Sequence, residues 1–173
     1  MNEYSIEISN GKAACDSAFY IYANDLLSKE CKRLCSFTEE LDKDTTKKKE
    51  HIAEYKCAKF RYSTVGRISK LLYYGNYVYR TSPEYVHLDI ENSLQSRPEL
   101  LSIVQRSNDE EKIDLKLYYG ISAIARDMQR NLEEKLAGAT AWEKVELEER
   151  IGGLQFAEEC LNEAWSRRKD VIK

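Results

Sequence analysis

Apolar and polar positions repeat with two different periods along the chain, and these periods predict its secondary structure. Residues 3–9 alternate strictly between apolar and polar side chains, which is the period of a half-buried strand, and Asn10 and Gly11 would end it with a turn. Much of the remaining chain repeats apolar residues at spacings of three or four, the period of amphipathic helices. The sequence therefore predicts a mainly α protein with a minor β element.

Two helical stretches in the first half of the chain predict an antiparallel hairpin. Residues 13–41 contain no proline or glycine and repeat apolar residues at helical spacing. A turn is expected at residues 42–46, followed by a helix over residues 47–73. Gly75 is expected to end this helix, because glycine adopts the left-handed conformation after a helix without strain.

The segment after Gly75 changes character. Residues 77–80 have the composition of a short strand, and pairing them with residues 3–9 would give both segments a partner. A hairpin across Gly75 and Asn76 is the alternative. Further on, Ser82-Pro83 and Arg97-Pro98 each have the composition of a helix start, so two short helices are expected before residue 107.

A second helical hairpin is predicted in the last third of the chain. Ser107 with Glu110, and Thr140 with Glu143, have the spacing of capping boxes, and an apolar stripe follows each of them. Gly138 would separate the two helices, which must lie antiparallel because the turn is short. The two hairpins together predict a helical bundle.

Glycines inside these two helices should each cost about 1 kcal/mol relative to alanine. Folding the hairpin about Gly138 would place Gly152 and Gly153 opposite Ile124 and Ala125, and Gly120 opposite Ala157. We therefore expect two helix backbones to approach closely at both glycine sites, with a kink as the alternative.

The chain is expected to form one domain. Its 173 residues would divide into a strand and hairpin (1–80), a connector with short helices (81–106) and the C-terminal hairpin (107–173). No apolar run is long enough to span a bilayer, and the N-terminus lacks the pattern of a secretory signal. The odd number of cysteines, five, favours reduced thiols in a cytoplasmic protein.

Charge is distributed unevenly along the chain. Residues 43–80 contain ten lysines and arginines against three carboxylates, although the whole chain has a formal net charge of −3. The same stretch carries six of the twelve tyrosines. Such an asymmetry bears on partners and on internal pairing of charges.

Four residues of the first hairpin are weak candidates for a metal site. Cys31 and Cys35 share a helix face, and the hairpin would bring them beside His51 and Cys57. However, His51 and Cys57 are six positions apart on a helix, so their side chains would point about 120° apart. We therefore expect free thiols that pack as small apolar groups, with no metal and no cofactor.

Catalytic motifs are scarce. Glu84 and His87 have the spacing used in carboxylate-bridged di-metal bundles, but such bundles need a second copy that this chain lacks. The sequence contains no phosphate-binding glycine loop, dinucleotide fingerprint, HExxH or CxxC motif. We therefore expect no enzymatic activity.

These observations favour a cytoplasmic adaptor or inhibitor that binds a protein partner. Because residues 43–80 are basic, this partner is expected to be acidic. A nucleic-acid-binding accessory protein that uses residues 43–80 is the alternative, because cations interleaved with aromatic rings suit phosphates and bases. A competing structural interpretation is that Glu30, Glu39 and Glu40 neutralise the lysines internally. The predicted contact residues are Lys56, Lys59, Arg67, Lys70, Tyr74, Tyr77 and Tyr79.

Overall fold

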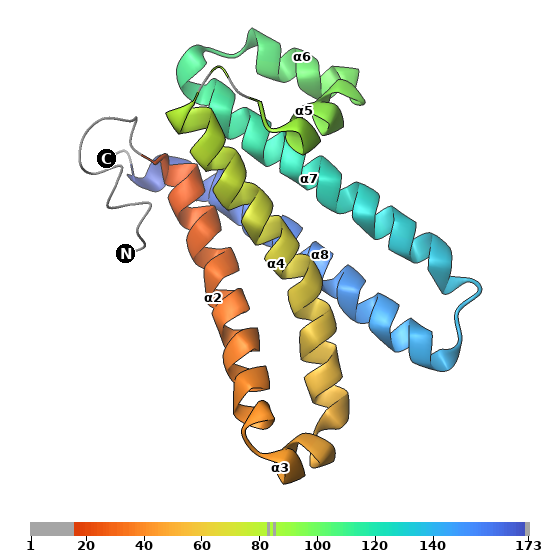
Figure 1. Ribbon diagram of the computed structural model, residues 1–173. Helices are drawn as coiled ribbons and strands as arrows, with labels where there is room; N and C mark the ends of the chain where they lie inside the picture. The colour runs from red at the N-terminus through yellow and green to blue at the C-terminus, as the bar shows by residue number, and fades with distance from the viewer. Residues whose placement is uncertain (1–15, 83, 85, 172–173) are drawn as a thin grey trace. The chain divides into compact units, whose positions relative to one another are not determined.

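The computed structural model describes residues 16–82, 84 and 86–171, and every regular element in these ranges is helical (Figure 1). The mainly α helical bundle predicted from the sequence periodicity is therefore confirmed. The elements are α2 (Ala18–Asp42), α3 (Thr45–Glu50), α4 (Ile52–Thr81), α5 (Leu88–Gln95), α6 (Pro98–Arg106), α7 (Asp109–Leu136), α8 (Ala141–Arg167) and the short 3-10 helix η1 (Arg168–Val171).

The predicted strand at residues 77–80 is wrong, because α4 continues through Gly75 to Thr81. Packing explains why glycine occupies this position inside a helix. A Cβ on Gly75 would lie 2.7 Å from the side chain of Ile90 and 3.0 Å from that of Leu117. Gly75 thus admits two side chains against the α4 backbone and does not end the helix. The other predicted strand, residues 3–9, lies outside the described residues.

The chain divides into two compact units. The first comprises residues 1–24, 71–124 and 161–173, and the second comprises residues 25–70 and 125–160. Each unit therefore combines segments from both halves of the sequence.

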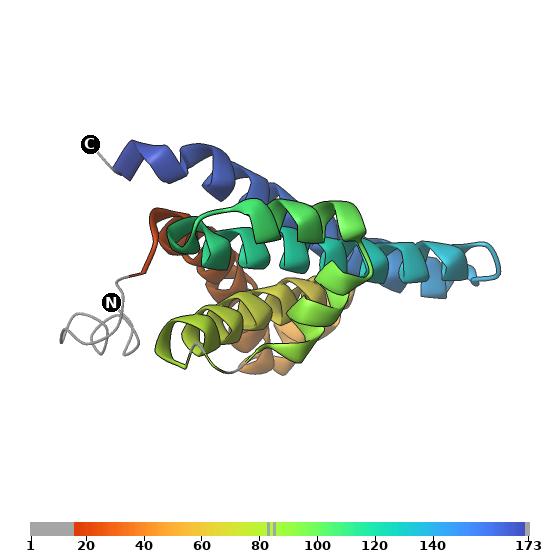
Figure 2. The same ribbon diagram turned by 90° about the horizontal axis from the view of Figure 1, so that it is seen from above.

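The core of the first unit is built from the second part of α4, the first half of α7 and the short helices. Figures 1 and 2 show α5 and α6 beside this half of α7. Gly120 makes room for α5, because a Cβ there would lie 2.6 Å from Ile90. Fully buried side chains in this unit include Phe19, Tyr20, Leu72, Ile90, Leu94, Leu117, Ile121 and Leu161.

An aromatic cluster closes one end of this core. The ring of Tyr118 stacks on Trp165 with 4.6 Å between centroids, and Phe19 meets both rings edge-on. The arginine Arg168 covers the face of Trp165 at 3.8 Å from its centroid.

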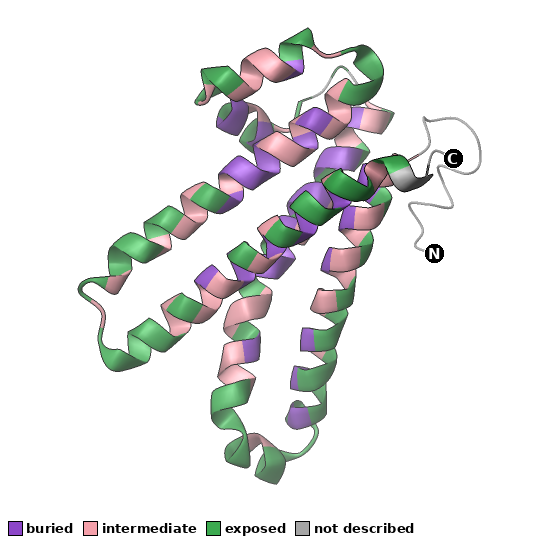
Figure 3. Ribbon diagram, turned by 180° about the vertical axis from the view of Figure 1, so that it is seen from behind, coloured by how far each residue is buried: buried purple, intermediate pink, exposed green. Residues whose placement is uncertain are grey.

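The second unit contains the closed ends of both hairpins. Along α2 and α4 the buried positions face each other (Figure 3). Its fully buried side chains include Leu27, Val65, Ile68, Leu154 and Ala157. The close approach predicted at the glycine pair occurs, but its partner is α4: a Cβ on Gly153 would lie 2.9 Å from the carbonyl oxygen of Arg61.

Helix ends agree with the predicted caps in part. Thr140 and Glu143 form the predicted capping box, with each side chain accepting the other's backbone N–H. At the start of α7 the capping side chain is Asn108, which accepts the N–H of Glu111, and not Ser107. The pattern located the helix start and missed its cap by one residue.

Candidate functional site

The stretch of α4 that follows Glu54 has an unusual composition. No aspartate or glutamate occurs between Glu54 and Glu84, whereas six cationic side chains do. These are Lys56, Lys59, Arg61, Arg67, Lys70 and Arg80. The structure divides them into two groups, according to whether another helix supplies a carboxylate.

Two of the six cations are paired internally. The guanidinium of Arg61 lies 3.5 Å from Glu30 and 3.9 Å from Glu149 in the second unit. Arg80 belongs to the first unit, where its side chain is 7% exposed and forms a 2.9 Å ion pair with Asp114. Burial raises the pKa of Asp114, while hydrogen bonding from Ser17 and the charge of Arg80 lower it. These two arginines therefore hold helices together.

The other four cations, Lys56, Lys59, Arg67 and Lys70, all lie in the second unit, and we call them the basic ridge. Lys59, Arg67 and Lys70 are exposed, and Lys56 is half-buried. None of the four forms an ion pair with a carboxylate in the described part of the chain. Their positive charge is therefore available to a partner.

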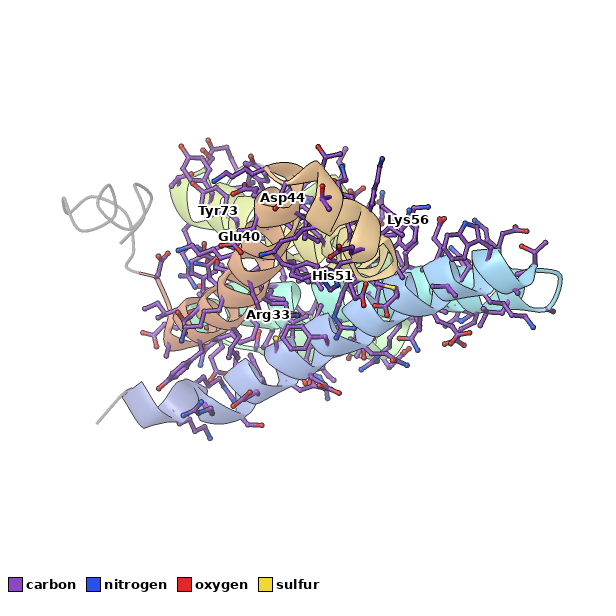
Figure 4. All side chains as sticks on the ribbon, turned by 90° about the horizontal axis from the view of Figure 1, so that it is seen from below. Arg33, Glu40, Asp44, His51, Lys56 and Tyr73 are labelled. Carbon is purple, nitrogen blue, oxygen red and sulfur yellow. The ribbon has the colours of Figure 1, made fainter. Side chains whose placement is uncertain are left out.

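Aromatic rings accompany the first two members of the basic ridge. The ammonium of Lys56, which Figure 4 labels, lies 4.9 Å from the ring centroid of Trp142 on α8. The ammonium of Lys59 lies 5.5 Å from the ring of Tyr55. Such contacts orient a lysine without neutralising its charge.

The acidic residues of α2 do not neutralise the basic ridge. Glu30 accepts two 2.8 Å hydrogen bonds from Arg33, which lower the pKa of its carboxyl, and it also faces Arg61. Glu39 and Glu40 are exposed and form no ion pair in the described residues. The competing interpretation, in which these three carboxylates match Lys56, Lys59 and Lys70, is therefore wrong.

Asp42, the last residue of α2, is a further carboxylate near the basic ridge. It accepts 2.9 Å hydrogen bonds from Lys48 and from the hydroxyl of Tyr55. These bonds lower the pKa of Asp42, and the charge of Lys59 contributes through space without an ion pair. Lys48, not Lys59, is thus the partner of Asp42.

The predicted tyrosines separate into exposed and buried residues within the first unit. The side chains of Tyr74 and Tyr77 are 56% and 40% exposed. Tyr79 is only 5% exposed, and its hydroxyl donates a 3.0 Å hydrogen bond to Glu91, which also binds Lys116 at 2.7 Å. Burial, followed by the charge of Glu91, raises the pKa of Tyr79. Tyr79 therefore belongs to an internal network and not to an exposed contact surface.

Cys57 on α4 is separated from the positions that face Cys31 and Cys35 of α2. Cys31 pairs with Ser69 and Cys35 with Tyr62, whereas Cys57 faces Glu149. Burial raises the pKa of both Cys31 and Cys57. Within the described residues, no three histidine, cysteine or acidic side chains converge as a metal site would require.

The register of the first hairpin explains this separation. The sequence suggested one helix from residue 47, but Asp44 caps the separate helix α3, and His51 ends it (Figure 4). Because α3 lengthens the connection, the side chains that face Cys31 and Cys35 are Ser69 and Tyr62, which lie beyond Cys57 along α4. His51 is exposed at this end of the hairpin.

Glu84 and His87 do not share a helix. Glu84 lies in a turn, and His87 is the N-cap of α5. Their spacing of three therefore does not place them on one face. The Nδ1 atom of His87 is buried, and no atom of the described residues forms a hydrogen bond with it.

An open hollow of about 750 Å³ lies at the end of the α7–α8 hairpin. Its lining combines apolar and charged side chains: Leu132, Glu134, Lys135, Gly138, Ala139, Glu143, Glu146, Leu147 and Arg150. Glu146 and Arg150 pair with each other at 3.1 Å. This lining contains no histidine, cysteine or serine and combines apolar contact with charged groups.

Two apolar residues on α8 that the sequence pattern did not single out are exposed. Trp142 and Val145 are 61% and 39% exposed. Both lie off the apolar stripe that Leu147, Ile151 and Leu154 define, and this offset is the signal in the sequence that would have indicated exposure.

Comparisons with protein families, with curated proteins and with solved structures gave no match to this chain. Of the described helices, none combines the length and the apolar character that crossing a bilayer requires.

Proposed function

We propose that this protein is a non-enzymatic adaptor or inhibitor that binds an acidic protein through the basic ridge. The observation that carries this proposal is the set of four cations on α4 that form no ion pair with any described carboxylate, in a chain whose net charge is negative. Arg61 and Arg80, which hold helices together, are by contrast paired with carboxylates.

The physical role of the ridge follows from its exposure. Opposite charges on two surfaces accelerate their encounter and select against partners of the wrong sign, while each exposed pair adds little affinity. Binding that depends on the ridge should therefore weaken as salt rises.

The test is a charge reversal of the ridge. Tagged wild-type protein and the variant Lys56→Glu/Lys59→Glu/Lys70→Glu are used to capture partners from nuclease-treated lysate of the source cells. We expect a stoichiometric protein to be recovered with the wild type and lost with the variant, while the melting temperature stays the same. Retained capture by the variant would refute the proposal.

A matched control separates local from overall charge. The variant Lys32→Glu/Lys135→Glu/Lys144→Glu makes the same change in net charge at three exposed lysines outside α4. This control should keep the captured protein. If material is captured only before nuclease treatment, the ridge binds nucleic acid and the protein-partner proposal fails.

A further inference from the structure

The exposed apolar residues of α8 adjoin the basic ridge within the second unit. Trp142 and Val145 are three positions apart and therefore share a helix face. Because the ammonium of Lys56 lies 4.9 Å from the Trp142 ring, the indole stands next to the start of the ridge. Lys56 and Lys59 on α4, with Trp142 and Val145 on α8, form one surface of charge and apolar area.

Carboxylates border this surface, and each has a partner. Glu146 pairs with Arg150 at 3.1 Å, and Glu149 lies 3.9 Å from Arg61. Glu143 accepts the backbone N–H of Thr140. Among the described residues, Glu143 therefore has no cation as a partner, and neither Lys56 nor Lys59 forms an ion pair with a carboxylate.

An exposed tryptophan beside cations is typical of an interface anchor. Tryptophan contributes a large, rigid apolar area and is enriched among the residues that dominate binding energy. In this protein the indole is 61% exposed and contacts a lysine, so an incoming apolar group can cover it without displacing a buried side chain.

We propose that the acidic partner presents an amphipathic helix to this surface. Its carboxylates would pair with Lys56 and Lys59, and its apolar side would cover Trp142 and Val145. Helices of this kind bind grooves and faces through apolar anchors at three- and four-residue spacing. This inference rests on the proposed function and adds the chemistry of the partner and its anchor residue.

The experiment uses a fluorescent peptide probe of glutamate and leucine, about five helical turns long, with leucine at helical three–four spacing. Its binding to the full-length protein is measured by fluorescence anisotropy. Two control peptides replace leucine by glutamine or glutamate by lysine. We expect the glutamate–leucine peptide to bind most tightly and the lysine peptide not to bind.

Two groups of variants test the two halves of the surface. Lys56→Glu/Lys59→Glu should abolish binding, and Trp142→Ala/Val145→Ala should weaken it on the order of tenfold or more. Trp142→Phe should restore part of the loss. Phe37→Ala, which removes another exposed aromatic ring of the second unit, should have no effect.

The outcomes distinguish this inference from the proposed function. If the lysine variant loses binding while the Trp142 and Val145 variant binds like the wild type, the apolar anchor is refuted and the basic ridge stands. If the peptide does not bind, or binds the lysine variant equally well, the amphipathic-helix partner is refuted, and the capture experiment alone decides the proposed function. Tighter binding of a single-stranded oligonucleotide at the same residues would assign the surface to nucleic acid and refute the peptide partner.

Discussion

Gly153 of α8 packs directly against Thr64 of α4, so that a Cβ on the glycine would overlap the threonine hydroxyl. Thr64 is buried, and its hydroxyl donates a 2.9 Å hydrogen bond to the carbonyl oxygen of Arg150, one turn earlier on α8. The two helix backbones therefore meet at this pair, with a polar bond in place of side-chain packing.

Replacing Gly153 by alanine should destabilise the protein. The new Cβ would lie 2.9 Å from the carbonyl oxygen of Arg61, which is backbone and cannot move alone. We expect a loss of about 1–3 kcal/mol in the free energy of unfolding, measured by urea denaturation. Gly152→Ala is the matched control, because it gains the same helix propensity but meets only the flexible end of the Arg61 side chain. Equal stabilities of the two variants would contradict the close approach.

The buried arginine of α4 should matter far more for stability than an exposed one. Arg80→Met removes the ion-pair partner of Asp114 and should cost up to about 3–5 kcal/mol near pH 7, because it leaves a largely buried carboxylate with only the Ser17 hydroxyl and the charge of Arg168. Arg67→Met, on the exposed side of the same helix, should change stability by about 0.5 kcal/mol or less.

The pH dependence of Arg80→Met follows from Asp114. Burial already raises the pKa of this carboxyl, and loss of the Arg80 charge should raise it further. When folding raises the pKa of a carboxyl, its contribution to stability is fully present below the pKa in the unfolded state, about 3.9. That contribution is lost as the pH rises through the pKa in the folded state. The deficit of the variant should thus shrink as pH falls. Thermal melts between about pH 4 and pH 7 that show a constant deficit would contradict this account.

Glu30 should show the opposite pH dependence. Hydrogen bonds from Arg33 lower the pKa of its carboxyl, so its stabilising effect is present above the unfolded value, about 4.3, and is lost as pH falls through the folded value. Glu30→Gln should cost about 1 kcal/mol near pH 7 and less near pH 3. Glu39→Gln, at an exposed position without an ion pair in the described residues, should be neutral at both. Melting temperatures at the two pH values test both expectations.

The protein should contain no dissociable structural metal. Cys31 and Cys35 face Ser69 and Tyr62, away from Cys57, so three thiolates cannot share one tetrahedral ion. We expect elemental analysis of protein purified without chelators to find well below one zinc per chain. One zinc per chain that is lost in Cys31→Ser or Cys35→Ser would refute this prediction.

Local patterns in the sequence determined the helices and several of their ends. Apolar spacing of three and four identified the long helices, and Pro98 and the Thr140–Glu143 capping box marked starts that the structure confirms. These signals suffice because a cap or an amphipathic stripe depends on residues within one or two turns. The basic composition of α4 was equally visible in the sequence.

Contacts between distant segments decided the rest. Gly75 looks like a helix end in the sequence, but Ile90 and Leu117 pack against it and the helix continues. The register of α2 against α4 depended on whether α3 formed. The observed register separates Cys57 from Cys31. Likewise, Arg61 and Lys59 are equivalent cations in the sequence. Arg61 is paired because Glu30 and Glu149 lie beside it on other helices, whereas Lys59 remains exposed. Burial and pairing are properties of neighbours in space, which helical periodicity alone does not specify.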